Sequence, residues 1–166
     1  MIFRYSLFPP NTSNIDKAII NIPNGECDDP EAECKSYEEK IAKAGGIDFQ
    51  LLGIGINGHI GFNEPDTCLR ALTHYAPLTE DTINANSRFF ASYDLVPKNA
   101  LTMGIETILQ AKKILLLCSG EKKADIIRDT VYGDITTQVP ASLLRLHHDV
   151  TIMTDTGAGK FLINSN

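Results

Sequence analysis

One glycine-rich segment of the chain, GIGINGHIGFNEP at residues 53–65, holds the side chains best suited to proton chemistry. It places His59 between Asn57 and Glu64. An imidazole supported by hydrogen-bonding neighbours can act as a general acid or base near neutral pH, and the glycines allow the backbone to approach a ligand closely. A lone histidine in a loop more often only forms hydrogen bonds to backbone groups. The surrounding sequence pattern therefore has to show whether His59 has a catalytic or a purely structural role.

The glycines of this segment also match a dinucleotide-binding pattern, since Gly53, Gly55 and Gly58 satisfy G-x-G-x-x-G after an apolar run. A dinucleotide loop must open a helix whose N-terminus holds the pyrophosphate. Gly61 and Pro65 interrupt any helix here within two turns. We therefore interpret the match as accidental and expect no nicotinamide or flavin cofactor.

The elements that position this segment alternate between strand and helix. Residues 47–54 form a short apolar run typical of a buried parallel strand, and it follows a helix predicted from Pro30 to Ala44 with Asp29 as its cap. Further strands are predicted at residues 113–118 and 150–153, with a weaker one at 18–22, and further helices at residues 104–110, 121–132 (capped by Ser119) and 140–147. This alternation predicts a Rossmann-like α/β fold, an open, mostly parallel sheet with helices on both faces.

Ligands of such sheets bind at the carboxyl ends of the strands, which directs attention to the loops after residues 54, 118 and 153. The stretch 66–86 has little apolar periodicity and is predicted to be a mobile flap over the site. No internal repeat or linker divides the 166 residues, so a single domain over residues 1–166 is expected.

Composition excludes several classes of partner. The formal net charge is −6 and no basic run is present, which disfavours nucleic acid and anionic membranes. The four cysteines lack metal-finger spacing and no apolar run approaches the ~20 residues of a membrane span, so we expect reduced thiols in a cytoplasmic protein. His147 and His148 diverge on a helix and lack partner ligands, so no metal is expected.

GIGINGHIGFNEP closely resembles the signature of the glucosamine-6-phosphate deaminase and galactosamine-6-phosphate isomerase family. Other stretches fall in that family's order at similar intervals: EAECKSYE, ANSRFF, VPK, ALTMG, GEKKA and LRLH. The resemblance covers the C-terminal two thirds of the family's chain and implies its sugar-phosphate isomerase fold. The family's N-terminal portion, with a phosphate loop and the aspartate thought to take the C2 proton, has no counterpart here. The resemblance therefore predicts a truncated version of the family domain.

The resemblance implies an enzyme that isomerises a 2-amino-2-deoxyhexose 6-phosphate, an aldose, to a ketohexose 6-phosphate with loss of ammonia. His59 would handle the ring-oxygen proton while Asn57 and Glu64 orient its imidazole. Arg88 and Lys123 would hold the phosphate, which suits a guanidinium and an ammonium close together. A truncated parallel sheet would leave an unpaired edge and an apolar face, which favour self-association, so we expect a homo-oligomer. No cofactor is expected.

The sequence departs from the family at three places. Asn57 stands where family deaminases usually have Asp, which removes a negative charge beside His59. The stretch DTCLRALTH lacks the paired serines of allosteric glucosamine enzymes, which favours a galactosamine-type member. Because the segment with the C2 base is missing, either the natural product is longer than the chain from Met1 or the chain is truncated, and we expect little activity from it alone.

Two other functions stay open. One is a hydrolase like 6-phosphogluconolactonase, whose Gly-His loop does not usually continue as FNEP, the sequence at residues 62–65 here. The other is a non-catalytic remnant that binds sugar phosphates, which the missing base would favour.

Overall fold

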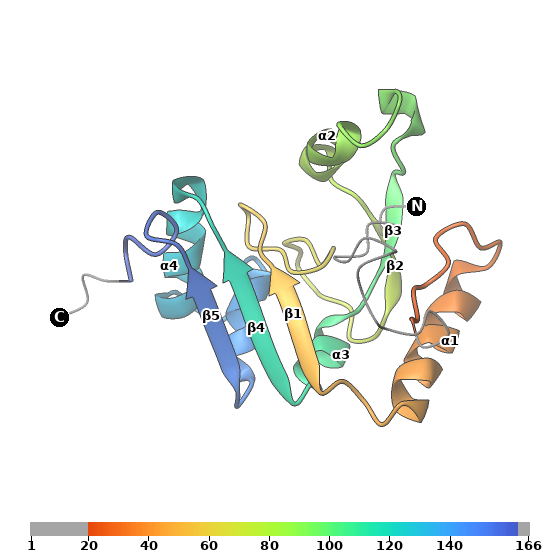
Figure 1. The fold of residues 1–166 in the computed structure, drawn as a ribbon, viewed down its shortest axis with the longest axis horizontal. Helices are drawn as coiled ribbons and strands as arrows, with labels where there is room; N and C mark the ends of the chain where they lie inside the picture. Colours follow the sequence, from red (N-terminus) through yellow and green to blue (C-terminus); the bar gives the residue numbers. More distant parts are fainter. Residues whose placement is uncertain (1–19, 163–166) are drawn as a thin grey trace.

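A three-stranded parallel sheet forms the centre of the computed structural model, which describes residues 20–162 (Figure 1). The strands lie in the order β1 (Phe49–Gly53), β4 (Lys113–Cys118) and β5 (Val150–Thr154). Three of the predicted strands are therefore confirmed, two of them with bounds that differ slightly at the ends. The weaker strand predicted at 18–22 is not, since residues 20–22 are irregular and the rest of it, like the opening MIFRYSLF, lies outside the described residues.

Helix α1 (Pro30–Lys43) begins and ends where its sequence signals predict. The Asp29 carboxylate accepts a hydrogen bond from the amide of Ala32, and Pro30 occupies the first turn, where its missing N–H costs nothing. The helix stops before Gly45 and Gly46, which have φ angles of 87° and 93°. Such left-handed conformations suit glycine because it lacks a Cβ.

The remaining predicted helices are present with different details. α3 spans Ile105–Leu109 and α4 spans Ala124–Tyr132, but residues 121–123 and 140–146 form 3-10 turns. The cap predicted at Ser119 is wrong: the amide of Gly120 instead bonds to the carboxylate of Asp155, 35 positions away in the chain. Among residues 20–162, no helix combines the length and apolar character needed to cross a membrane.

The two faces of the sheet differ in burial. On one face, Leu52, Ile114 and Leu116 pack beneath α3, α4 and the 3-10 turn of residues 140–146, and Leu116 is fully buried. Alternate residues of the same strands point the other way and stay exposed in the described structure: Phe49, Leu51, Leu117 and Met153. Helices on this second face, which the fold prediction includes, are not among residues 20–162.

The stretch predicted as a flap has regular structure. It contains β2 (His74–Pro77), which pairs antiparallel with β3 (Asn99–Thr102), and α2 (Glu80–Ser87), followed by a 3-10 turn at Tyr93–Leu95. β2 pairs with β3, which follows only after a helix and a loop. The local pattern of apolar residues therefore does not predict this strand. Ala76, Leu78 and Phe62 form a second small core here. That core holds α2 beyond the carboxyl end of β1 (Figure 1).

Candidate active site

The glycine-rich loop leaves β1 at its carboxyl end and folds back on itself. The amide of Gly55 donates to the carbonyl of His59 at 3.0 Å, and the amide of Gly58 donates to the carbonyl of Gly55 at 3.1 Å. A Cβ at position 55 would overlap the imidazole of His59, so glycine is needed for the ring to lie where it does. Residues 54–73 contain no helix, unlike a dinucleotide-binding loop.

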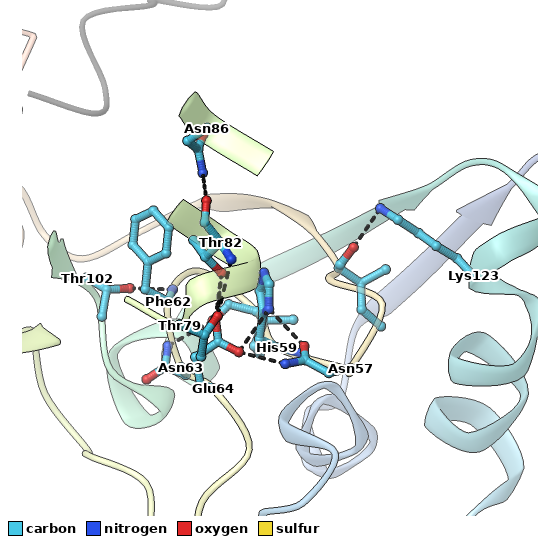
Figure 2. Close-up of polar contacts among 12 residues, drawn as sticks. Asn57, His59, Phe62, Asn63, Glu64, Thr79, Thr82, Asn86, Thr102 and Lys123 are labelled. Atoms are coloured by element: carbon cyan, nitrogen blue, oxygen red, sulfur yellow. Dashed lines mark hydrogen bonds and ion pairs between the residues drawn. The ribbon is translucent and has the colours of Figure 1, made fainter. Parts of the chain in front are cut away.

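The loop brings Asn57, His59 and Glu64 into one hydrogen-bonded cluster (Figure 2). His59 Nδ1 lies 2.9 Å from Asn57 Oδ1 and 3.2 Å from Glu64 Oε2. Asn57 Nδ2 donates to the same Glu64 Oε2 at 2.7 Å, and the backbone amide of His59 donates to Asn57 Oδ1 at 3.2 Å. The three candidate acid–base residues are therefore in mutual contact. We call them the acid–base cluster.

These contacts assign the tautomer of His59. Both atoms that face Nδ1 accept hydrogen bonds, so Nδ1 carries the proton, which they share. Nε2 of the neutral ring then has its lone pair available as a base.

Asn57 and Glu64 interact with the imidazole of His59 in different ways. Glu64 supplies the negative charge that Asn57 lacks. The amide of Asn57 in turn donates to Glu64, which a carboxylate at position 57 could not do.

Glu64 is held in its ionised form. Burial raises the pKa of this carboxyl, but hydrogen bonds from His59 and Asn57, the charge of His59 and the hydroxyl of Thr82 outweigh that effect and lower the pKa to about 2. Sequence reasoning missed Thr82 and Thr79, whose hydroxyls lie 3.0 and 3.4 Å from Glu64 Oε1. A threonine cap followed by Glu80 and Asp81 marks the start of α2 in the sequence, and that capping signal could have found them.

The two predicted phosphate-binding cations lie at different parts of the site. Lys123 Nζ donates to the carbonyl of Ile54 at 2.7 Å, which holds it against the start of the glycine-rich loop (Figure 2). Arg88 is exposed at the C-terminal end of α2, with its guanidinium 4.7 Å from the centre of the Phe89 ring. Neither cation forms an ion pair with a carboxylate within residues 20–162.

Of the two adjacent histidines, His147 has a structural role, whereas His148 is exposed. His147 Nε2 lies 2.6 Å from the carbonyl of Ala111, and Nδ1 accepts from the amide of Asp149 at 3.1 Å. Both ring nitrogens of His147 thus form hydrogen bonds that hold the segment directly before β5 in place. In the described part of the chain, no group of three or more His, Cys, Asp or Glu side chains could hold a metal ion, and all four cysteines are free thiols.

Known proteins resemble the chain along most of its length. Residues 3–153 match the family described as Glucosamine-6-phosphate isomerases/6-phosphogluconolactonase. A glucosamine-6-phosphate deaminase of Thermoanaerobacter sp. (strain X514) is 57% identical over 152 residues, which cover 92% of this chain and 60% of that protein. The deaminase of Clostridium acetobutylicum is 58% identical over 150 residues, or 90% of this chain and 62% of its own length.

Two solved structures are also similar to the chain. One described as a monomeric glucosamine-6-phosphate deaminase has a TM-score of 0.80 and 54% identity, covering 84% of this chain and 58% of that one. A 6-phosphogluconolactonase from Trypanosoma cruzi shares the fold at a TM-score of 0.61, with 22% identity over 85% of this chain and 55% of its own. The chain thus spans about 60% of the length of its curated relatives, and it belongs to the glucosamine-6-phosphate isomerase and 6-phosphogluconolactonase family.

Proposed function

We propose that this chain carries the ring-opening and phosphate-binding part of an enzyme that converts glucosamine 6-phosphate to a ketohexose 6-phosphate and ammonia. The observation that carries the proposal is the acid–base cluster, found in a chain 57% identical to a glucosamine-6-phosphate deaminase. The proposal assigns the isomerase and deaminase activity to the complete protein and these steps to this chain.

Ring opening needs one proton to move between two oxygens of the sugar. Nε2 of His59 takes the proton of the C1 hydroxyl and returns it to the ring oxygen as the C1–O5 bond breaks, which leaves an aldehyde at C1. The transient imidazolium is stabilised by Glu64, whose Oε2 lies 3.2 Å from Nδ1. His59 thus acts as base and then as acid, and no net proton is consumed.

The phosphate of the substrate is assigned to Arg88 and Lys123. Each can give a charge-assisted hydrogen bond, and Arg88 can bind two phosphate oxygens at once. Lys123 is fixed at the loop that carries His59.

We propose glucosamine 6-phosphate as the substrate, in place of galactosamine 6-phosphate, because the similar proteins are named glucosamine-6-phosphate deaminases. This outweighs the galactosamine-type prediction from DTCLRALTH. The 6-phosphogluconolactonases share only the fold at 22% identity, so hydrolase activity is the weaker alternative. Assembly into a homo-oligomer also stays a prediction: the exposed apolar face of the sheet supports it, whereas the similar solved enzyme is described as monomeric.

A cytoplasmic location likewise stays a prediction, and the free thiols of all four cysteines support it.

The test is ammonia release from glucosamine 6-phosphate and galactosamine 6-phosphate, with lactone hydrolysis measured in parallel. Two proteins are compared: the 166-residue chain, and the same chain fused to the portion of a deaminase relative that it does not span. We expect ammonia from glucosamine 6-phosphate in the fusion at a typical enzymatic turnover of about 1 to 10³ s⁻¹, and little from the chain alone. Lactone hydrolysis without ammonia would contradict the proposal, and sugar-phosphate binding without either product would indicate the non-catalytic remnant.

A further inference from the structure

We propose that the hydroxyls of Thr79 and Thr82, at the start of α2, position Glu64 and through it the imidazole of His59. This inference rests on the proposed function for its kinetic consequence only. Thr82 Oγ1 lies 3.0 Å from Glu64 Oε1, and Thr79 Oγ1 lies 3.0 Å from Thr82 Oγ1. Both threonines act through Glu64 in this proposal, so they are positioning residues.

Counting protons fixes the direction of this hydrogen-bond chain. Glu64 is ionised at neutral pH and can only accept, so the single proton of the Thr82 hydroxyl goes to Oε1. The Thr79 hydroxyl then donates to Thr82 Oγ1, because its contact with Glu64 is longer, at 3.4 Å. Thr79 Oγ1 in turn accepts from the backbone amide of Thr82 at 3.3 Å. This series of hydrogen bonds thus runs from the start of α2 to the carboxylate of Glu64, and each hydrogen bond polarises the next.

The two oxygens of Glu64 therefore serve different elements. Oε2 bonds to Asn57 and His59 in the glycine-rich loop, whereas Oε1, among residues 20–162, bonds to Thr82 and to the cap residue Thr79 at the start of α2. Without the Oε1 contacts, the carboxylate could rotate about its terminal torsion and lose its alignment with Nδ1. Thr82 is 7% exposed, so water cannot easily replace its hydroxyl. Because Arg88 is the C-cap residue directly after α2, the same helix joins the carboxylate to a predicted phosphate ligand.

The test reads the His59 tautomer by ¹⁵N NMR in the 166-residue chain at neutral pH, with the signals assigned by comparison with His59→Gln. In the wild type, we expect Nδ1–H to dominate. Thr82→Val should shift the ring toward a mixture of tautomers, and Thr82→Ser, which restores the hydroxyl, should return it. The matched control is Thr130→Val, since Thr130 is also buried but bonds to the carbonyl of Ile126 within α4. This control should leave the His59 signals unchanged.

Kinetics in the fusion enzyme supply a second measurement. Thr82→Val should lower kcat about tenfold, the usual effect of losing one hydrogen bond to a charged group, and leave KM within about twofold. A folded Thr82→Val with the wild-type tautomer and the wild-type kcat would overturn the inference. If that variant fails to fold, Thr82→Ala also removes the hydroxyl, and an unchanged tautomer there would overturn the inference equally. The tautomer is measured without turnover, so an inactive wild-type fusion enzyme would refute the proposed function and leave this test intact.

Discussion

The acid–base cluster and the two cations differ in how firmly hydrogen bonds within the described residues hold them in place. Asn57, His59 and Glu64 come from one loop and bond to one another at 2.7 to 3.2 Å. Lys123 and Arg88 come from different elements, and their charges have no carboxylate partner within the described residues. The proposed proton-transfer group is thus already held in place by its own hydrogen bonds, whereas the two proposed phosphate ligands share no such network in the described residues. Substitutions in the first group should change kcat, and substitutions in the second should change binding.

The largest effect is expected from removing His59. In the fusion enzyme, His59→Ala should lower kcat by about 10²- to 10⁴-fold, the usual contribution of a positioned proton-transfer group, with little change in the affinity for the sugar phosphate. An open-chain substrate analogue should be far less sensitive, because its ring is already open. The control is His148→Ala at an exposed histidine. Equal losses with cyclic and open-chain substrates would move His59 to another step.

The next effect concerns stability and pH. Because the pKa of Glu64 lies near 2, well below its ordinary value of 4.5, its ionised form stabilises the fold above pH 4.5, and that contribution is lost as the pH falls toward 2. Its side chain is 13% exposed, so screening by solvent is limited.

Glu64→Gln should therefore unfold more easily at neutral pH by up to roughly 3 kcal/mol. The difference from wild type should close as the pH falls from 4.5. Denaturant titrations at several pH values measure it, with Glu39→Gln, an exposed carboxyl on α1, as the control. A difference that stays constant with pH would contradict the assigned ionisation.

A smaller effect is expected at the cations. Arg88→Ala and Lys123→Ala should each weaken binding of phosphorylated sugars by about 10- to 100-fold, as expected for charge-assisted hydrogen bonds of ~1.5 to 3 kcal/mol. Affinity for unphosphorylated sugars should barely change. Calorimetry with both ligand types measures this, and Lys122→Ala is the matched control at the neighbouring exposed lysine. Unchanged affinity in both variants would make these residues ordinary surface charges.

The smallest effect is expected at Asn57. Asn57→Asp replaces the amide that donates to Glu64 Oε2 with a second carboxylate, so the pKa of Glu64 should rise from about 2. The loss of stability on acidification should then begin at a higher pH than in the wild type. Turnover at neutral pH should change less than about tenfold, because a carboxylate at this position still accepts from Nδ1. An unchanged acid transition would show that the contact between Asn57 and Glu64 has little electrostatic effect.

Sequence reasoning located the elements with strong local signals. The Asp29 cap and the Gly45-Gly46 stop bounded α1 to within a residue, and three apolar runs became the parallel sheet. It failed where the signal was a distant partner, as in the pairing of β2 with β3 and the bond from Gly120 to Asp155. It located the acid–base cluster by resemblance, whereas Thr79 and Thr82 went unnoticed. The roles of all these residues, and the single domain over residues 1–166, remain predictions.

The sequence by itself determined which groups could meet in the glycine-rich loop, because Asn57 and Glu64 are seven positions apart and can lie at most about 25 Å from each other even in a fully extended chain. Tertiary structure decided which atom of each group faces which. The docking of α2 against the second small core brings Thr82 to Glu64 across 18 positions. The acceptors around Nδ1 then select one of two tautomers of nearly equal intrinsic energy. Hydrogen bonds depend on distance and direction to within a few tenths of an ångström, and only the packed chain sets those.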